Sequence, residues 1–82
     1  MIQGAMALGL SKEVATTLTA QTMLGAATLL DQSGKSATTL RENVTSPNGT
    51  TAAALASLNE SDFAGIVAKA MKAARDRSQE LA

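Results

Sequence analysis

The 82 residues of this sequence include no cysteine and no histidine. Without cysteine no disulfide can form, and without either residue the usual ligands of zinc are missing. Paired carboxylates in an apolar setting and a G-x-G-x-x-G loop are also lacking, so there is neither an acid–base pair nor a phosphate-cradling loop. We therefore predict no metal site and no cofactor-binding residues, and we expect these residues alone to be inactive as an enzyme.

Aromatic residues are almost absent as well, because Phe63 is the only one. Much of the apolar content is alanine, which adds little area to a core. A chain this short buries only about 60–65% of the surface that its unfolded form exposes. The sequence therefore predicts a single domain, residues 1–82, with a thin core that needs a partner.

Charge of one sign is not in excess, since seven basic residues balance seven acidic ones. Such a chain has no field that would gather nucleic acid or an anionic membrane, and neither partner is expected. The start of the sequence has no secretory signal, which favours the cytoplasm. The segment from Val14 to Leu30 has no charged residue, but threonines and Gln21 interrupt it, so it is too short and too polar to span a membrane. A membrane-surface peptide is disfavoured by the neutral net charge and by the lack of tryptophan and phenylalanine residues that would anchor it.

No strand alternation is present, and the apolar spacing predicts helices throughout. Residues 1–8 read as the end of a helix that stops at Gly9. The next helix, about 12–33, has Ser11 as its N-cap and Gly34 at its end. The sequence predicts an all-α fold.

The second half of the chain is predicted to form three helices. A short helix starts at Ser36 and runs to about Val44, and a strong turn signal follows at 45–49. The next helix is expected over about Thr51–Asn59. We predict that Ser61 caps the last helix, with Asp62 in its first turn and one apolar face buried.

The helix expected over residues 12–33 is apolar on almost every side. One stripe holds Val14, Leu18, Gly25 and Leu29, and much of the opposite side is also apolar. Such a helix must be buried on several sides. The other helices are too short to surround it, which favours a second copy as the other wall, and hence an obligate dimer. The alternative is the central helix of a monomeric bundle.

The segment from Thr45 to Thr51 stands out as a candidate anion site, because it leads directly into an alanine-rich helix. A helix start has unpaired N–H groups and partial positive charge, which stabilise a carboxylate or phosphate. Gly49 permits close approach of the backbone, and the hydroxyls of Ser46, Thr50 and Thr51 can donate or accept hydrogen bonds. The alternative is an ordinary turn followed by helix-capping residues, because serine and threonine before a helix are caps more often than they are ligands.

The whole segment resembles the signature of pyrroline-5-carboxylate reductases. The resemblance is carried by LRENVTSPNGTT at 40–51, by QTMLGAA at 21–27 and by RSQEL at 77–81. The resemblance spans nearly the whole chain, but it covers only the C-terminal dimerisation domain of a family member. The family's nucleotide-binding domain therefore has no counterpart here. In the family a long helix enters the dimerisation domain, and this chain is expected to start inside that helix. Asn48 stands where the family usually has glycine, and asparagine tolerates the positive φ that the turn needs.

The resemblance implies that the complete protein reduces pyrroline-5-carboxylate to L-proline with hydride from NADPH or NADH, and that its helices interleave with those of a second subunit. It also implies roles for single residues. Ser46 and the backbone N–H groups of Thr50 and Thr51 would hold the substrate carboxylate, with Asn48 and Gly49 shaping the loop around it, and the Thr51 hydroxyl would bond the ring nitrogen as the catalytic group. The competing hypothesis is a stand-alone helical interaction module that forms homo-oligomers.

Overall fold

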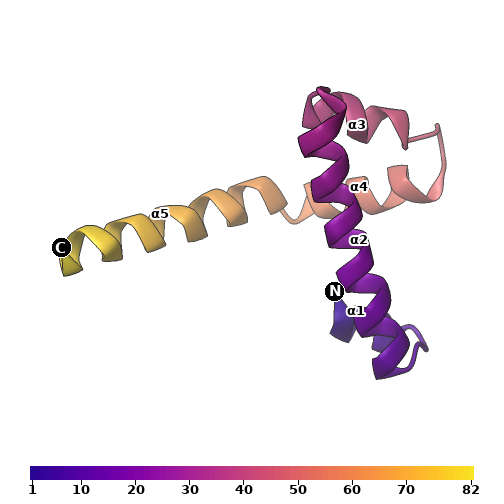
Figure 1. The fold of residues 1–82 in the computed structure, drawn as a ribbon, viewed down its shortest axis with the longest axis horizontal. Coiled ribbons are helices and arrows are strands. Elements are labelled where there is room, and N and C mark those ends of the chain that lie inside the picture. Colours follow the sequence, from indigo (N-terminus) through magenta and orange to yellow (C-terminus); the bar gives the residue numbers. More distant parts are fainter. The chain divides into compact units, whose positions relative to one another are not determined.

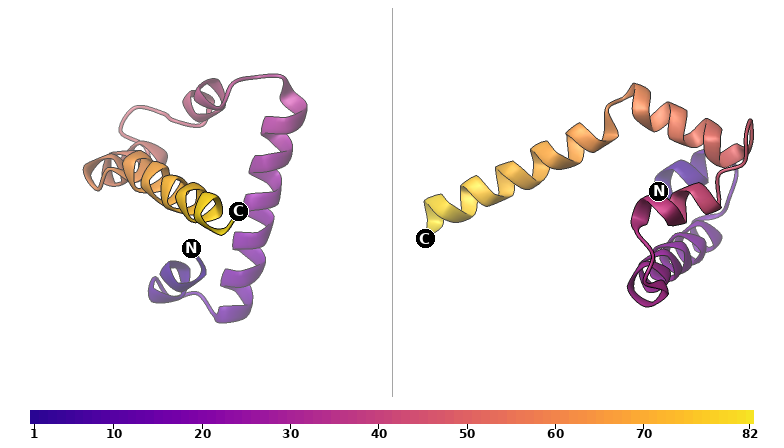
Figure 2. Two further views of the ribbon diagram at one scale, coloured as in Figure 1. Left: turned by 90° about the vertical axis from the view of Figure 1, so that its left-hand side faces the viewer. Right: turned by 90° about the horizontal axis from the view of Figure 1, so that it is seen from above.

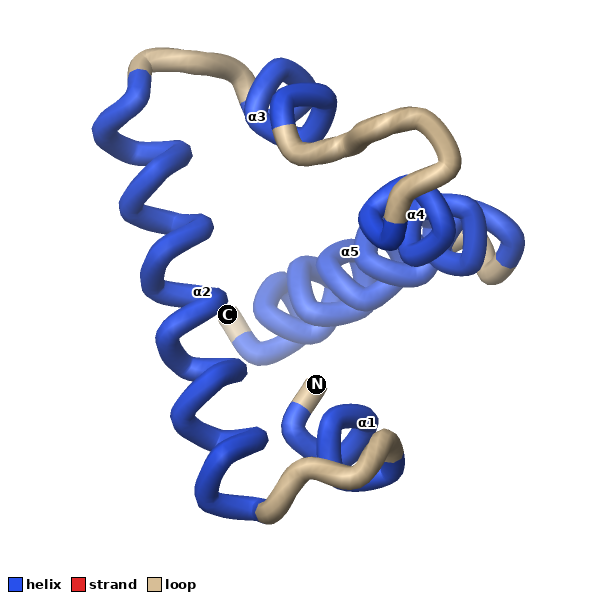
Figure 3. The backbone as a smooth tube through the Cα atoms, turned by 90° about the vertical axis from the view of Figure 1, so that its right-hand side faces the viewer, coloured by secondary structure: helices blue, strands red, loops and turns tan.

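The computed structural model describes all residues from 1 to 82 and contains five α-helices and no strand (Figure 3). The predicted all-α class is therefore confirmed. The helices are α1 (Ile2–Ala7), α2 (Lys12–Ser33), α3 (Ala37–Asn43), α4 (Thr50–Glu60) and α5 (Phe63–Leu81). None of the five combines the length and hydropathy that crossing a bilayer requires.

The chain consists of two compact units, and the first covers residues 1–41. In this unit α1 lies beside the first turns of α2 (Figures 1 and 2). Between them the chain reverses at Gly9, whose φ of 109° is strained for any residue with a side chain. The contact buries Ala15 completely, and no other residue of the chain is fully buried.

Both ends of α2 follow from its local sequence. The hydroxyl of Ser11 accepts a hydrogen bond of 3.2 Å from the Val14 N–H, as an N-cap should. Glu13 lies in the first turn, where the partial positive charge of the helix start favours a carboxylate. At the other end Gly34 adopts the left-handed conformation, with φ 71°. The boundaries predicted from the sequence are confirmed.

Helix α3 also begins as predicted, because Ser36 caps it. The Ser36 hydroxyl accepts a bond of 3.1 Å from the Thr39 N–H and lies 3.0 Å from the Thr39 hydroxyl. The helix crosses the division between the two units, and the second unit covers residues 42–82.

In the second unit, α4 and α5 are separated by only Ser61 and Asp62, and the chain turns between them (Figure 2). Our prediction for this turn was wrong, because Ser61 ends α4 and Asp62 is the N-cap of α5. Asp62 adopts a left-handed conformation with φ 53°, which aspartate tolerates better than most residues. The helix α4 continues to Glu60, so the chain has only two residues in which to change direction, and Ser61 is used in closing α4.

Three exposed ion pairs lie along α5. Lys72 Nζ is 2.7 Å from an Asp76 carboxylate oxygen, Arg75 contacts the other oxygen of the same carboxylate at 2.9 Å, and Arg77 lies 2.9 Å from Glu80. Hydrogen bonds from Lys72 first and Arg75 second hold the pKa of Asp76 below its usual value. These pairs support the helix locally and leave its apolar residues unpartnered.

The apolar residues of the chain are largely open to solvent. On α2, Leu18, Leu24 and Leu29 are 52%, 60% and 51% exposed. On α5, Ile66 and Met71 are also exposed, so the apolar face that we expected to be buried is not buried within this chain. Apart from α4, the second unit has no complete helix that could cover α5.

Candidate anion-binding site at the start of α4

The loop before α4 is a hydrogen-bonded turn formed by residues 46–49. The Gly49 N–H donates to the Ser46 carbonyl at 3.1 Å, and the third residue of the turn, Asn48, has a φ of 60°. Pro47 in second place and a positive φ in third place fit a type II turn. Asparagine fills the position that usually takes glycine, as the sequence predicts.

Gly49 leaves room for Ser46 in this turn, although its own backbone angles do not call for glycine. Its φ of −83° and ψ of −179° are open to any residue. A Cβ at this position, however, would collide with the Ser46 Oγ and would lie 3.2 Å from the Ser46 carbonyl oxygen. The missing side chain therefore lets the Ser46 hydroxyl lie beside the start of α4.

The N–H groups at the start of α4 have no partner within the chain. Gly49 is the N-cap residue and provides no side-chain cap, and the first amide to bond inside the helix is that of Ala53, which donates to the Gly49 carbonyl at 3.1 Å. The amides of Thr50, Thr51 and Ala52 precede it. No acidic side chain occupies the first turn. Unpaired N–H groups and the positive end of the helix dipole together favour an anion at this point.

The hydroxyl groups around this helix start are also available. Ser46 is exposed and Thr51 is half-buried, and neither side chain makes a hydrogen bond within the chain. Ser11 and Ser36, by contrast, bond the N–H groups of the helices that follow them. The alternative that the loop residues are ordinary helix caps is therefore not what the structure shows at α4.

All five predicted site residues lie in this one loop and the first turn of α4. Ser46, Asn48 and Gly49 form the turn, and Thr50 and Thr51 begin the helix. The N–H of Ala52, which is the third unpaired amide, was not predicted from the sequence. The position of the helix start was the signal that could have found it, because the first three amides of a helix have no intrahelical acceptor.

Comparison with known proteins identifies the family. The sequence profile described as "Pyrroline-5-carboxylate reductase dimerisation" matches residues 1–81. The chain belongs to this family. It is 51% identical over 75 residues to the pyrroline-5-carboxylate reductase of Pseudomonas aeruginosa, covering 92% of this chain and 28% of the relative. It is 42% identical over 81 residues to the reductase of Arabidopsis thaliana, covering 99% of this chain and 29% of the relative.

A solved structure agrees with this assignment. The crystal structure of Plasmodium falciparum pyrroline carboxylate reductase with NADP bound superimposes with a TM-score of 0.91 at 34% identity, covering 94% of this chain and 31% of that one. The resemblance recognised in the sequence is thereby confirmed. The chain spans only between a quarter and a third of the length of these reductases.

Proposed function

We propose that this chain is the dimerisation and substrate-carboxylate-binding domain of a pyrroline-5-carboxylate reductase, which reduces 1-pyrroline-5-carboxylate to L-proline. The observation that supports the binding role is the uncapped start of α4, with three unpaired N–H groups beside the Ser46 hydroxyl. The family assignment supplies the substrate, because the relatives are pyrroline-5-carboxylate reductases.

The substrate carboxylate would lie over the start of α4. Its two oxygens accept hydrogen bonds from the N–H groups of Thr50 and Thr51 and from the Ser46 hydroxyl. Hydrogen bonds to a charged acceptor are worth about 1.5–3 kcal/mol each, roughly twice a neutral one. The absence of an acidic residue in the first turn removes the side chain that would otherwise compete for these donors.

Holding the carboxylate also places the reacting bond. In the substrate the carboxylate is borne by the ring carbon next to the nitrogen, and the C=N carbon that accepts hydride lies on the other side of that nitrogen. The Thr51 hydroxyl, in the same helical turn as the amides, then bonds the ring nitrogen, on which electron density rises as hydride adds to the carbon. A clamped carboxylate and a fixed nitrogen together orient the imine for transfer.

The hydride in this reaction comes from a nicotinamide cofactor. These 82 residues do not fit such a group, because the all-helical chain has no strand leading into a glycine-rich phosphate loop. We therefore assign NADPH or NADH to a part of the complete reductase outside these residues. What this domain contributes is the binding and orientation of the substrate.

Self-association is the second part of the proposal. The leucines of α2 are largely exposed in the single chain, and the family profile that matches it is described as a dimerisation domain. A second copy would cover this surface in a homodimer or a larger homo-oligomer.

The test of the binding role uses the complete reductase with single substitutions in the loop. Thr51→Val removes one neutral hydrogen bond, worth about 0.5–1.5 kcal/mol, and should lower kcat/KM by a few-fold to about tenfold. Ser46→Ala should raise KM more than it lowers kcat, because a carboxylate anchor serves substrate and transition state about equally.

Thr50→Val is the matched control, because it makes the same change at the neighbouring residue. It removes the Thr50 hydroxyl, keeps a side chain of nearly the same shape and leaves the backbone N–H in place. It should leave kcat/KM within about twofold of the parent enzyme. If Thr51→Val were equally harmless in a folded, dimeric enzyme, Thr51 would have no role at the nitrogen. If Ser46→Ala also left KM unchanged, the loop would not be the carboxylate site.

A further inference from the structure

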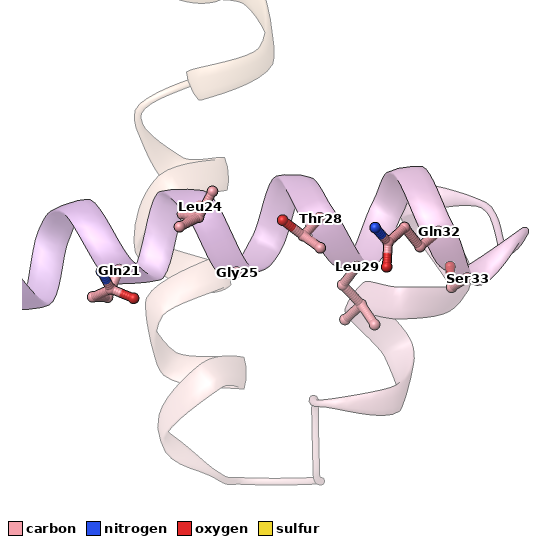
Figure 4. Close-up of a pocket in the computed structure, with 7 residues that line it drawn as sticks. All are labelled: Gln21, Leu24, Gly25, Thr28, Leu29, Gln32 and Ser33. Carbon is pink, nitrogen blue, oxygen red and sulfur yellow. The ribbon is translucent and has the colours of Figure 1, made fainter.

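Asn48 carries the only side-chain amide of this chain that lies outside a helix. Figure 4 shows two of the others, Gln21 and Gln32, on α2 beside an open groove. The remaining asparagines, Asn43 and Asn59, belong to α3 and α4. Asn48 lies in the turn before α4, is exposed, and makes no side-chain hydrogen bond within the chain. Its amide group is therefore open to chemical attack.

An asparagine side chain can be attacked by the backbone of the residue that follows it, and this reaction makes asparagine one of the thermolabile residues. The backbone nitrogen of the next residue bonds the side-chain carbonyl carbon, and the bond from that carbon to the NH2 group breaks. Ammonia leaves with the proton of the backbone N–H, and a five-membered succinimide ring remains. Water then adds to one ring carbonyl and opens the ring, which gives either aspartate or isoaspartate. The sum of the two steps exchanges ammonia for water, so no other reactant is needed.

The residue after each asparagine decides how easily the ring closes. Val44 follows Asn43, and its β-branched side chain crowds and stiffens the backbone. Glu60 follows Asn59 and is the last residue of α4, so the helix holds its backbone in place. Asn48 alone is followed by glycine, which has no side chain to hinder the attack and allows the widest range of backbone angles. The sequence and the fold thus both single out this asparagine.

The turn itself holds the attacking nitrogen by one bond. The Gly49 N–H donates to the Ser46 carbonyl oxygen at 3.1 Å, so the turn has to open before this nitrogen can react. Asn48 has a φ of 60°, a left-handed conformation that is unfavourable for a residue with a Cβ. An opened turn releases this strain, which favours opening.

We propose that Asn48 deamidates spontaneously and that the carboxylate so formed switches off the anion site at the start of α4. The product places a negative charge on the residue before the N-cap, Gly49, close to the unpaired amides. The positive end of the helix dipole attracts this charge, and the charge repels a substrate carboxylate. The first turn of α4 has no acidic side chain, so the modification creates a competitor that the unmodified chain lacks. The deamidation follows from Asn48 and its neighbours, whereas the switch rests on the carboxylate-binding role proposed above.

The chemical step is tested in the complete reductase by mass spectrometry. Trypsin cleaves after arginine and lysine, so residues 42–69 form one peptide that contains all three asparagines. The native enzyme is incubated in mildly alkaline buffer and digested beside an unincubated sample. We expect a mass gain of about one dalton at Asn48, with at least tenfold less conversion at Asn43 and Asn59, which serve as internal controls. Equal conversion at the three positions, or none at Asn48, would overturn the proposal.

The switch is tested by steady-state kinetics of the same enzyme. Asn48→Asp carries the product's charge from the start and should raise KM about tenfold. The incubated parent enzyme should move toward this KM in proportion to its conversion. Asn48→Gly has no amide to lose, so its KM should be the same before and after incubation. A rise in KM as large as that of the parent in this variant would refute the switch, because ageing would then act elsewhere.

Ser46→Ala separates a failure of the switch from a failure of the proposed function. If Ser46→Ala raises KM while Asn48→Asp and the converted parent enzyme do not, the switch is refuted and the carboxylate-binding role stands. If none of the three raises KM, both the switch and the binding role of the loop are refuted.

Discussion

Replacing Gly49 by alanine tests how the loop positions the Ser46 hydroxyl. The added Cβ would collide with the Ser46 Oγ and would lie 3.2 Å from the Ser46 carbonyl oxygen, where the backbone must shift by a few tenths of an ångström. The backbone angles of Gly49 suit alanine, so the substitution introduces no conformational strain of its own. The serine side chain can relieve the collision by rotating to another staggered rotamer, which moves its hydroxyl from its present position beside the start of α4.

The effect on stability should be small and the effect on binding large. Alanine is a poorer N-cap than glycine by up to about 1 kcal/mol, and this is offset by about 0.4–1 kcal/mol from the lower entropy of the unfolded chain. The hydrogen bond that we propose between Ser46 and the substrate carboxylate would be worth about 1.5–3 kcal/mol, because the acceptor is charged. KM should therefore rise about 10- to 150-fold, with little change in kcat.

A double-mutant cycle in the complete reductase isolates this cause. If Gly49→Ala acts by moving the Ser46 hydroxyl, it should raise KM strongly in the parent enzyme and only slightly when Ser46 is already alanine. Additive effects of the two substitutions would show that Gly49→Ala acts on the backbone amides instead. A KM within twofold of the parent value would refute the argument altogether.

Two further outcomes follow from the exposed surface and from α5. The melting temperature of the 82-residue chain should rise with protein concentration, because folding and association are coupled when one chain has almost no core. A cooperative melt that does not depend on protein concentration would contradict this prediction. The lowered pKa of Asp76 means that its ion pairs add stability above the pKa of an unfolded aspartate and lose it as pH falls through the lowered value. Asp76→Asn should therefore slightly weaken the dependence of helicity on acid pH. Added salt should abolish this difference, because the ion pair between Lys72 and Asp76 is exposed. An equal acid dependence of helicity in the parent and variant chains at low salt would refute the prediction.

The helices could be predicted from sequence because each boundary is set by a local signal. Ser11 and Ser36 cap their helices, and Gly9 and Gly34 end theirs, through interactions that span only a few residues. The turn at Ser61 and Asp62 could not be predicted in the same way. Serine and aspartate are about equally good N-caps by statistics, but only two residues separate α4 from α5, and the bend between the helices places one of them, Asp62, at a positive φ.

Burial was harder to predict than the helices, because it depends on what lies outside the chain. The spacing of Phe63, Ile66 and Met71 indicates an apolar face on α5, and that face exists, but in this chain it is exposed. A periodic pattern shows which side of a helix avoids water without showing what covers it. The need for a second chain was visible instead in composition, through the single aromatic residue and the all-round apolar character of α2.

The loop at α4 differs from the rest of the domain in how its geometry is maintained. Its turn is fixed by bonds over short range, from the Gly49 N–H to Ser46 and from the Ala53 N–H to Gly49, and by the contact between Ser46 and Gly49. None of these requires a buried core. Once the start of α4 has formed, these local bonds arrange the donors, and a carboxylate bound as we propose would have to displace only water from them. Assembly would add the exclusion of water, which strengthens each of these hydrogen bonds by lowering the local dielectric constant. The arrangement of the donors comes from one chain and their strength depends on the second, so a substitution that weakens association should weaken substrate binding while leaving the choice of ligand unchanged.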